Sequence, residues 1–86
     1  MSSSDDQHEV FPTRLEMRRI DPSRNMRRFY LMQVQPDLFG GVSLVREWGR
    51  IGRGGRMLVE HHADEGEAVT ALMDMARAKT RRGYKA

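Results

Sequence analysis

The pattern of apolar and polar residues along this chain changes its period once, near residue 64. Before that point, short apolar runs alternate with polar residues and are separated by turn-forming residues, which is typical of β-strands. After it, six apolar residues recur at the spacing of one helical stripe: Ala68, Val69, Leu72, Met73, Met75 and Ala76. The pattern therefore predicts several strands followed by one helix.

The first part of the chain predicts four strands, over residues 14–20, 27–35, 41–51 and 56–63. Residues 27–35 have apolar side chains on both faces, so we expect a central strand that is covered on part of both sides. Turn-forming residues lie between the strands, and the turn before the last one contains three glycines, which allow a tight reversal. Consecutive strands joined by short turns predict an antiparallel sheet.

The helix is predicted over residues 65–81. Asp64 is placed to cap its first turn, with Glu67 three residues later as in a capping box. Gly83 is placed to end it, and we expect Tyr84 to fold back over the helix end. The predicted fold is α+β, a four-stranded antiparallel sheet with one C-terminal helix packed on one face.

The length of 86 residues predicts one small domain. Residues 1–12 are polar and acidic and predict a disordered tail, so the domain spans residues 13–86. The sequence contains no cysteine, which excludes disulfides and thiolate chemistry. It also has no apolar run of membrane-spanning length and no signal-peptide pattern at its N-terminus, so we expect a cytoplasmic protein without a membrane partner.

The charge of the chain is unevenly distributed. Residues 1–12 contain three acidic and no basic residues, so residues 13–86 carry all fifteen basic residues against nine acidic ones, a net charge of +6. Thirteen of the fifteen are arginine, which suits planar contact with phosphate. A basic domain of this size indicates a polyanionic partner, most often nucleic acid.

Catalytic functions find little support in the sequence. Two of the three histidines, His61 and His62, are neighbours on a predicted strand, so they point to opposite faces and cannot easily share one metal ion. No nucleophile or nucleotide-binding motif is present, and the glycines at 52–55 precede a strand, whereas a Walker loop precedes a helix. We therefore predict no catalytic residues, no metal site and no cofactor.

The stretch from residue 46 to 56 is the candidate binding surface. Strand alternation places Trp48 on one face with Arg46 and Arg50, unless a bulge at Gly49 breaks the parity. An aromatic ring flanked by guanidinium groups suits a base or sugar with its phosphates. The alternative is that Trp48 anchors the core, and its spacing alone favours burial. The candidate nucleic-acid-binding residues are Arg46, Trp48, Gly49, Arg50, Arg53 and Arg56.

These residues carry a resemblance to a known family. Trp48-Gly49-Arg50-Ile51-Gly52 resembles the signature of the WGR domain, which is named after that tripeptide. The resemblance extends to Phe29, Tyr30 and Gln33 in the strand upstream, and to Lys79, Thr80, Gly83 and Tyr84 at the helix end. It covers about residues 14–85 and includes a basic, glycine-containing turn after the tripeptide.

The resemblance implies a fold and a binding mode. WGR domains occur in DNA-dependent poly(ADP-ribose) polymerases and in bacterial proteins, including short stand-alone chains, and in the polymerases they form an antiparallel sheet with one helix. There they bind at DNA breaks, which implies that Trp48 packs against the terminal nucleotide and Arg50 contacts phosphate. The family's catalytic activity is not implied, because 86 residues leave no room for a transferase domain. Roles for Arg46, Arg53 and Arg56 are inferred from position instead.

The sequence thus predicts a non-catalytic, sequence-independent nucleic-acid-binding module with a preference for strand ends or nicks, and the resemblance favours DNA over RNA. The alternative is a protein-interaction module that docks a partner chain or domain. Exposed apolar residues around Leu38, Phe39 and Trp48 would favour that alternative. The oligomeric state is left open by the sequence.

Overall fold

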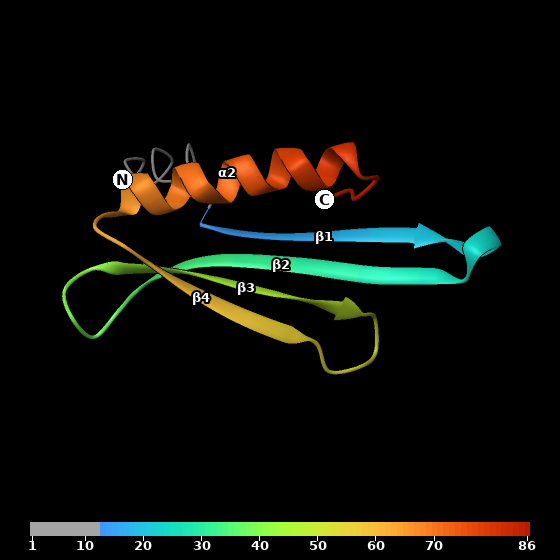
Figure 1. The fold of residues 1–86 in the computed structure, drawn as a ribbon, viewed down its shortest axis with the longest axis horizontal. Helices are drawn as coiled ribbons and strands as arrows, with labels where there is room; N and C mark the ends of the chain where they lie inside the picture. Colours follow the sequence, from blue (N-terminus) through green and yellow to red (C-terminus); the bar gives the residue numbers. More distant parts are fainter. Residues whose placement is uncertain (1–12) are drawn as a thin grey trace, which may run out of the picture.

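The computed structural model describes residues 13–86 as a four-stranded antiparallel sheet with one helix lying along one of its faces (Figure 1). The order of the strands in the sheet is the order in the chain, so the sheet is a simple meander. This architecture confirms the predicted fold class. The predicted acidic tail, residues 1–12, lies outside the described residues. The elements are β1 (Arg14–Asp21), the short 3₁₀-helix η2 (Pro22–Arg24), β2 (Met26–Pro36), β3 (Val42–Arg50), β4 (Arg56–His62) and α2 (Glu65–Arg81).

The strand register decides which side chains share a face. Tyr30 of β2 lies opposite Met17 of β1 and Trp48 of β3, and Trp48 lies opposite Arg56 of β4. The β2–β3 pairing runs unbroken through Gly49, so no bulge interrupts the alternation. Even-numbered residues of β2, β3 and β4 therefore share one face with the odd-numbered residues of β1. The strand ends differ from the predicted ones by at most one residue.

The core lies between this face and α2. Its buried cluster comprises Met17, Tyr30, Met32, Leu44, Leu72 and Tyr84. The other face of the sheet, which carries Phe29 and Leu31, is covered by no element of residues 13–86 (Figure 1). β2 lies between β1 and β3, as predicted for a central strand, and Phe29 and Leu31 are partly buried on this face although no helix or strand of the described chain lies over it. No helix of the described residues is long and apolar enough to cross a membrane.

The first turn of α2 is capped mainly as predicted. The Asp64 carboxylate accepts a hydrogen bond from the Glu67 N–H at 2.8 Å. In a capping box the Glu67 carboxylate would accept a hydrogen bond from the N–H of the cap residue, Asp64. Here it accepts one from the N–H of Ala63, one residue earlier, at 3.2 Å.

The end of α2 is a Schellman motif. Gly83 has a φ of 98°, and its N–H bonds the Thr80 carbonyl while the Tyr84 N–H bonds the Lys79 carbonyl, both at 3.0 Å. This geometry turns Tyr84 back under the helix, where its buried ring meets the ring of Tyr30 edge-on at 6.4 Å. The predicted roles of Gly83 and Tyr84 are confirmed.

Candidate nucleic-acid interface

Trp48 combines features of the two roles considered for it, a core anchor and a ligand-binding surface. Its ring is half-buried and stacks on Tyr30, with 5.6 Å between ring centroids and 13° between the planes. Tyr30 is fully part of the core, whereas Trp48 packs against that cluster from its margin. Trp48 therefore extends the core outward and still presents part of its surface to a pocket.

That pocket is a basic cleft at one end of the sheet. It has a volume of about 670 Å³, and its aromatic surface is formed by Tyr30, Trp48 and Tyr84. Gly49 also lines it. Its six basic side chains are Arg19, Arg28, Arg50, Arg56, Lys79 and Arg82. We call these lining residues together the cationic cleft.

The strand register and the length of the helix bring these residues together. Arg19 lies opposite Arg28, and Arg28 lies opposite Arg50, so three arginines from three strands form a row across the helix-side face. The helix ends at Arg81, and its terminal turns add Lys79 and Arg82 to this row from above. Because this end of the face lies at the helix terminus, its side chains line a cleft and are not sealed into the core.

The charge of the cationic cleft is uncompensated by acidic groups. None of its lining residues is acidic. Within residues 13–86, no carboxylate forms an ion pair with its arginines; the ion-paired arginines are Arg18, Arg24, Arg46 and Arg77, outside the cleft. Arg50 donates long hydrogen bonds of 3.3 and 3.4 Å to the Asn25 carbonyl and side-chain oxygen. A concave surface lined by one sign of charge concentrates the opposite charge from solution.

Lys79 links the charge of the cleft to its aromatic rings. Its ammonium lies 4.4 Å from the centroid of the Tyr30 ring and 5.5 Å from that of Tyr84. Burial lowers the pKa of Lys79 below its ordinary value of 10.5, and the charges of Arg82 and Arg46 lower it further. An anion bound in the cleft would oppose these effects and favour the charged ammonium.

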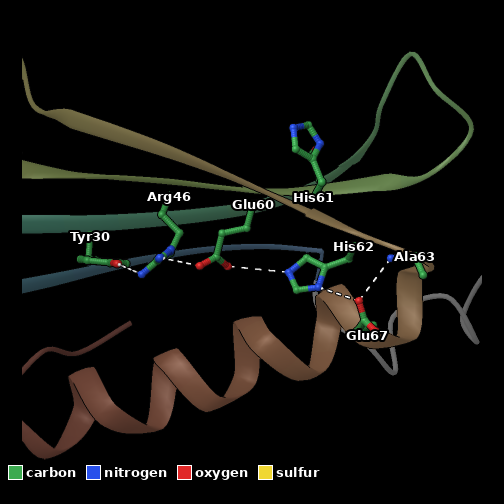
Figure 2. Close-up of polar contacts among 8 residues, drawn as sticks. Tyr30, Arg46, Glu60, His61, His62, Ala63 and Glu67 are labelled. Carbon is green, nitrogen blue, oxygen red and sulfur yellow. Dashed lines mark hydrogen bonds and ion pairs between the residues drawn. The ribbon is translucent and has the colours of Figure 1, made fainter.

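Arg46 is held in a different place from the other predicted site residues. Its guanidinium donates to the Tyr30 hydroxyl at 3.1 Å and to the Glu60 carboxylate at 2.6 Å (Figure 2). Figure 2 shows the row continuing from Glu60 to His62 and on to Glu67 at the start of α2, with the His62–Glu67 contact at 3.0 Å. Arg46 therefore orients the ring on which Trp48 stacks.

The predicted site residues thus fall into two groups. Trp48, Gly49, Arg50 and Arg56 meet in the cationic cleft, whereas Arg46 lies under the helix and Arg53 lies in the exposed β3–β4 turn. Sequence reasoning missed several lining residues: Arg19, Arg28, Tyr30, Lys79, Arg82 and Tyr84. Strand parity was a usable signal for Arg19 and Arg28, whereas cations at a helix end, such as Lys79 and Arg82, are commonly explained by the helix dipole alone.

Two of the four glycines of the β3–β4 hairpin, Gly49 and Gly55, are required by close packing. A methyl group at Gly49 would lie 2.9 Å from the Cα of Gly55, and one at Gly55 would collide with the carbonyl oxygen of Trp48. The close approach of these two backbones holds the β3–β4 turn against the Trp48 strand. Gly49 is therefore needed for the hairpin, in addition to any room that it leaves for a ligand.

Residues 13–86 match the sequence model of the WGR domain. The chain belongs to the WGR domain family. It is also similar to the uncharacterized protein y4dW of Sinorhizobium fredii (strain NBRC 101917 / NGR234), with 50% identity over 74 residues. The aligned region covers 86% of this chain and 36% of that relative, so the WGR domain chain spans about a third of the relative's length. No solved structure gives a significant match.

Nothing in the structure or the comparisons points to catalysis by this WGR domain. Among residues 13–86, no group of three or more His, Cys, Asp or Glu side chains is arranged to hold a metal ion. His61 and His62 lie on opposite faces of β4, as their adjacency predicted, with His62 beside Glu67 (Figure 2). The His61 ring lies 3.3 Å from the Ser43 hydroxyl.

Proposed function

We propose that this WGR domain is a non-catalytic module that binds nucleic acid, with DNA favoured over RNA, independently of base sequence. The observation that carries the proposal is the cationic cleft, in which six basic side chains surround three aromatic rings without an acidic neighbour. Membership of a family of the nucleic-acid-binding type agrees with it. The predicted cytoplasmic location would give the module access to such a ligand.

The chemistry of the cleft matches a sugar-phosphate chain more closely than a free base. Guanidinium groups bind phosphate oxygens through paired hydrogen bonds and carry no sequence information when they do so. The half-buried Trp48 ring offers a surface for one sugar or base, a contact worth roughly 1–3 kcal/mol. A pocket that accepts one such group between cations suits a strand end or nick, as the resemblance of Trp48 and Arg50 to the family tripeptide also implies.

The remaining predicted site residues have distinct places in the proposal. Arg50 and Arg56 contact phosphates within the cleft, and Arg53 contacts a flanking phosphate from the exposed turn. Arg46 contributes through the Tyr30 hydroxyl that it holds.

Fluorescence anisotropy of labelled DNA tests the proposal. Blunt and nicked duplexes are titrated with protein at several salt concentrations, with closed-circular DNA as an unlabelled competitor and a single-stranded RNA for comparison. We expect log Kd to depend on log salt with a slope of about 0.9 per phosphate contacted in duplex DNA. We also expect the closed circle to compete less well than the nicked duplex.

Two variants and a matched control locate the binding surface. Arg50→Ala removes an exposed cleft cation and should lower the salt slope by about 0.9 without affecting folding. Arg14→Ala removes another exposed arginine, on the face of the sheet opposite the cleft, and should leave the slope unchanged. Trp48→Ala should weaken binding about 5- to 150-fold and needs a parallel melting curve, because the ring also packs on the core. Absence of binding by the wild type at low salt, or equal losses for Arg50→Ala and Arg14→Ala, refutes the proposal.

A second candidate function, docking of a partner protein, rests on the β2–β3 loop. Leu38 and Phe39 are 96% and 89% exposed there, at the end of the sheet away from the cationic cleft. Two adjacent apolar side chains in this setting are typical of a contact site. A pull-down from nuclease-treated lysate, compared for wild type and Leu38→Ser/Phe39→Ser, tests it. Capture that is equal for both, or that disappears with nuclease, rejects this candidate.

A further inference from the structure

The outer edge of β4 is the open edge of the sheet. In the meander, β4 pairs with β3 on one side, and no strand of residues 13–86 pairs with its other side (Figure 1). The opposite edge of the sheet, formed by β1, is partly paired. The backbones of Arg18 in β1 and Lys85 near the C-terminus exchange two hydrogen bonds of 2.8 Å. The backbone groups of β4 therefore remain available for a further strand.

The hydrogen-bonding parity shows which groups of β4 face outward. At the end of the β2–β3 ladder, the Ile51 N–H donates a hydrogen bond to the Arg27 carbonyl. Because the backbone groups of successive residues in an antiparallel strand point to alternate sides, the N–H and C=O groups of odd-numbered β3 residues point toward β2. Those of even-numbered β3 residues point toward β4. The β4 partners of those even-numbered residues include Leu58, which lies opposite Arg46. Consequently the N–H and C=O groups of Met57 and Val59 point away from the sheet.

The same segment exposes apolar side chains on both of its faces. Met57, Leu58 and Val59 are 62%, 42% and 44% exposed, in the middle of a regular strand. Edge strands in soluble proteins are usually protected by charges, a proline or a bulge. In β4 the pairing with β3 is regular, no proline is present, and the charges lie at Arg56 and Glu60, on either side of the three apolar residues. The apolar segment between these two charges is suited to pairing with another strand.

A second copy of β4 satisfies this edge when the two strands run antiparallel around a two-fold axis at Leu58. In this register, Leu58 faces Leu58 of the second copy, Met57 faces Val59, and Arg56 faces Glu60, so apolar residues meet apolar ones and opposite charges meet. Shifting the axis to Val59 would place Leu58 opposite Glu60 and Arg56 opposite His62. Charge and apolar complementarity therefore select the register centred on Leu58.

We propose that this chain forms a homodimer through antiparallel pairing of β4 with β4 of a second copy, centred on Leu58, which joins two sheets into one of eight strands. The Met57 and Val59 backbone groups supply the hydrogen bonds, and Leu58 occupies a non-hydrogen-bonded pair, in which Cα atoms are about 4.5 Å apart. The contact is small beside standard interfaces of roughly 1,600 Å², so the dimer is weak and depends on concentration.

The dimer has a defined geometry with respect to the rest of the molecule. A two-fold axis perpendicular to the sheet keeps both α2 helices on the same side and both open faces on the other. The apolar residues of each open face, Leu31, Val45, Met57 and Val59, then lie on the same side of the joined sheet, with Gln33, Gln35 and Glu47 among them. The pairing does not require nucleic acid, and Arg56 is the one residue that it shares with the cationic cleft.

The absence of cysteine from the chain allows a direct test of the register. Leu58→Cys places two sulfurs across the axis at a separation that suits a disulfide, for which Cα atoms lie roughly 4.4–6.8 Å apart. We expect Leu58→Cys to form a covalent dimer under mild oxidation faster than Leu38→Cys, whose more exposed site reports random collision. Equal rates for the two overturn the proposal, and so does faster crosslinking of Val59→Cys, which reports the rival register.

Sedimentation velocity of nuclease-treated protein tests the association without crosslinking. We expect the wild type to shift from monomer toward dimer as its concentration rises, and Leu58→Lys to weaken the dimer roughly tenfold or more, because like charges then face each other across the axis. Leu38→Lys is the matched control and should behave as the wild type. A wild type that stays monomeric at all concentrations overturns the dimer while leaving nucleic-acid binding to be judged separately, by anisotropy at concentrations below dimerisation.

Discussion

Arg46 provides the sharpest distinction between a structural and a binding role for the arginines of β3. Arg46→Met removes the guanidinium that bonds Glu60 at 2.6 Å and Tyr30 at 3.1 Å, while keeping much of the apolar stem. If Arg46 acts through these contacts, the variant loses stability and keeps its number of phosphate contacts. If Arg46 contacts nucleic acid directly, the variant keeps its stability and loses one contact.

The expected loss of stability in Arg46→Met follows from the burial of the Arg46–Glu60 ion pair. The Arg46 and Glu60 side chains are 14% and 36% exposed, so the carboxylate left behind regains part of its hydration from water. A hydrogen bond to a charged group contributes roughly 1.5–3 kcal/mol to stability. With this exposure, we expect Arg46→Met to lower the free energy of unfolding by about 2 kcal/mol. For a domain of this size that corresponds to a fall in Tm of about 8–16 °C.

Thermal unfolding followed by circular dichroism and salt-dependent anisotropy measure the two quantities. Arg50→Met is the matched comparison, because Arg50 is exposed and lines the cationic cleft. It should change stability by no more than about 0.5 kcal/mol and lower the salt slope by about 0.9. Glu60→Gln should resemble Arg46→Met in stability. An Arg46→Met protein with wild-type Tm and a slope reduced by about 0.9 refutes the positioning role.

Three further changes have defined outcomes. Gly55→Ala should destabilise the hairpin by about 2 kcal/mol or more, because its methyl group meets the Trp48 carbonyl oxygen; urea unfolding measures this, with the open position Gly54→Ala as control. Lys79→Gln should lower the salt slope of DNA binding by about 0.9, and an unchanged slope contradicts its place in the cleft. Asp37 has a pKa lowered below 3.8, first by the Phe39 N–H and also by the Gly41 N–H and His61. Its carboxylate therefore stabilises the fold above about pH 3.8, and this contribution is lost as the pH falls through the lowered pKa. Urea unfolding from about pH 6 to 2 should show the difference between wild type and Asp37→Ala shrinking with acid, and a difference independent of pH contradicts this assignment.

Much of the fold could be predicted because its signals are local. Alternation marks the strands, and the three-to-four-residue spacing of Val69, Leu72 and Ala76 marks the helix. The Asp64 cap and the Gly83 terminus depend on backbone preferences within a few residues, and both were found in the structure. The error at Glu67 is small and also local, since Ala63 competes with Asp64 for the same carboxylate.

The site was predicted less completely because it is assembled by register. Parity placed Arg46, Trp48 and Arg50 on one face, as the register shows. The same face holds two environments, however, since α2 covers Arg46 and ends beside Arg50. Where a helix ends over a sheet depends on packing between distant segments, and no local pattern encodes it.

The amino-acid sequence by itself determined the order and type of the elements, the basic character of residues 13–86 and the tripeptide that identifies the family. Only the tertiary structure decided that Trp48 is half-buried on Tyr30, that Arg46 pairs with Glu60, and that Arg19, Arg28, Lys79 and Arg82 complete the cleft. The physical reason is that helix and strand periods follow from neighbouring residues, whereas burial and charge pairing follow from strand register and from the position of the helix over the sheet.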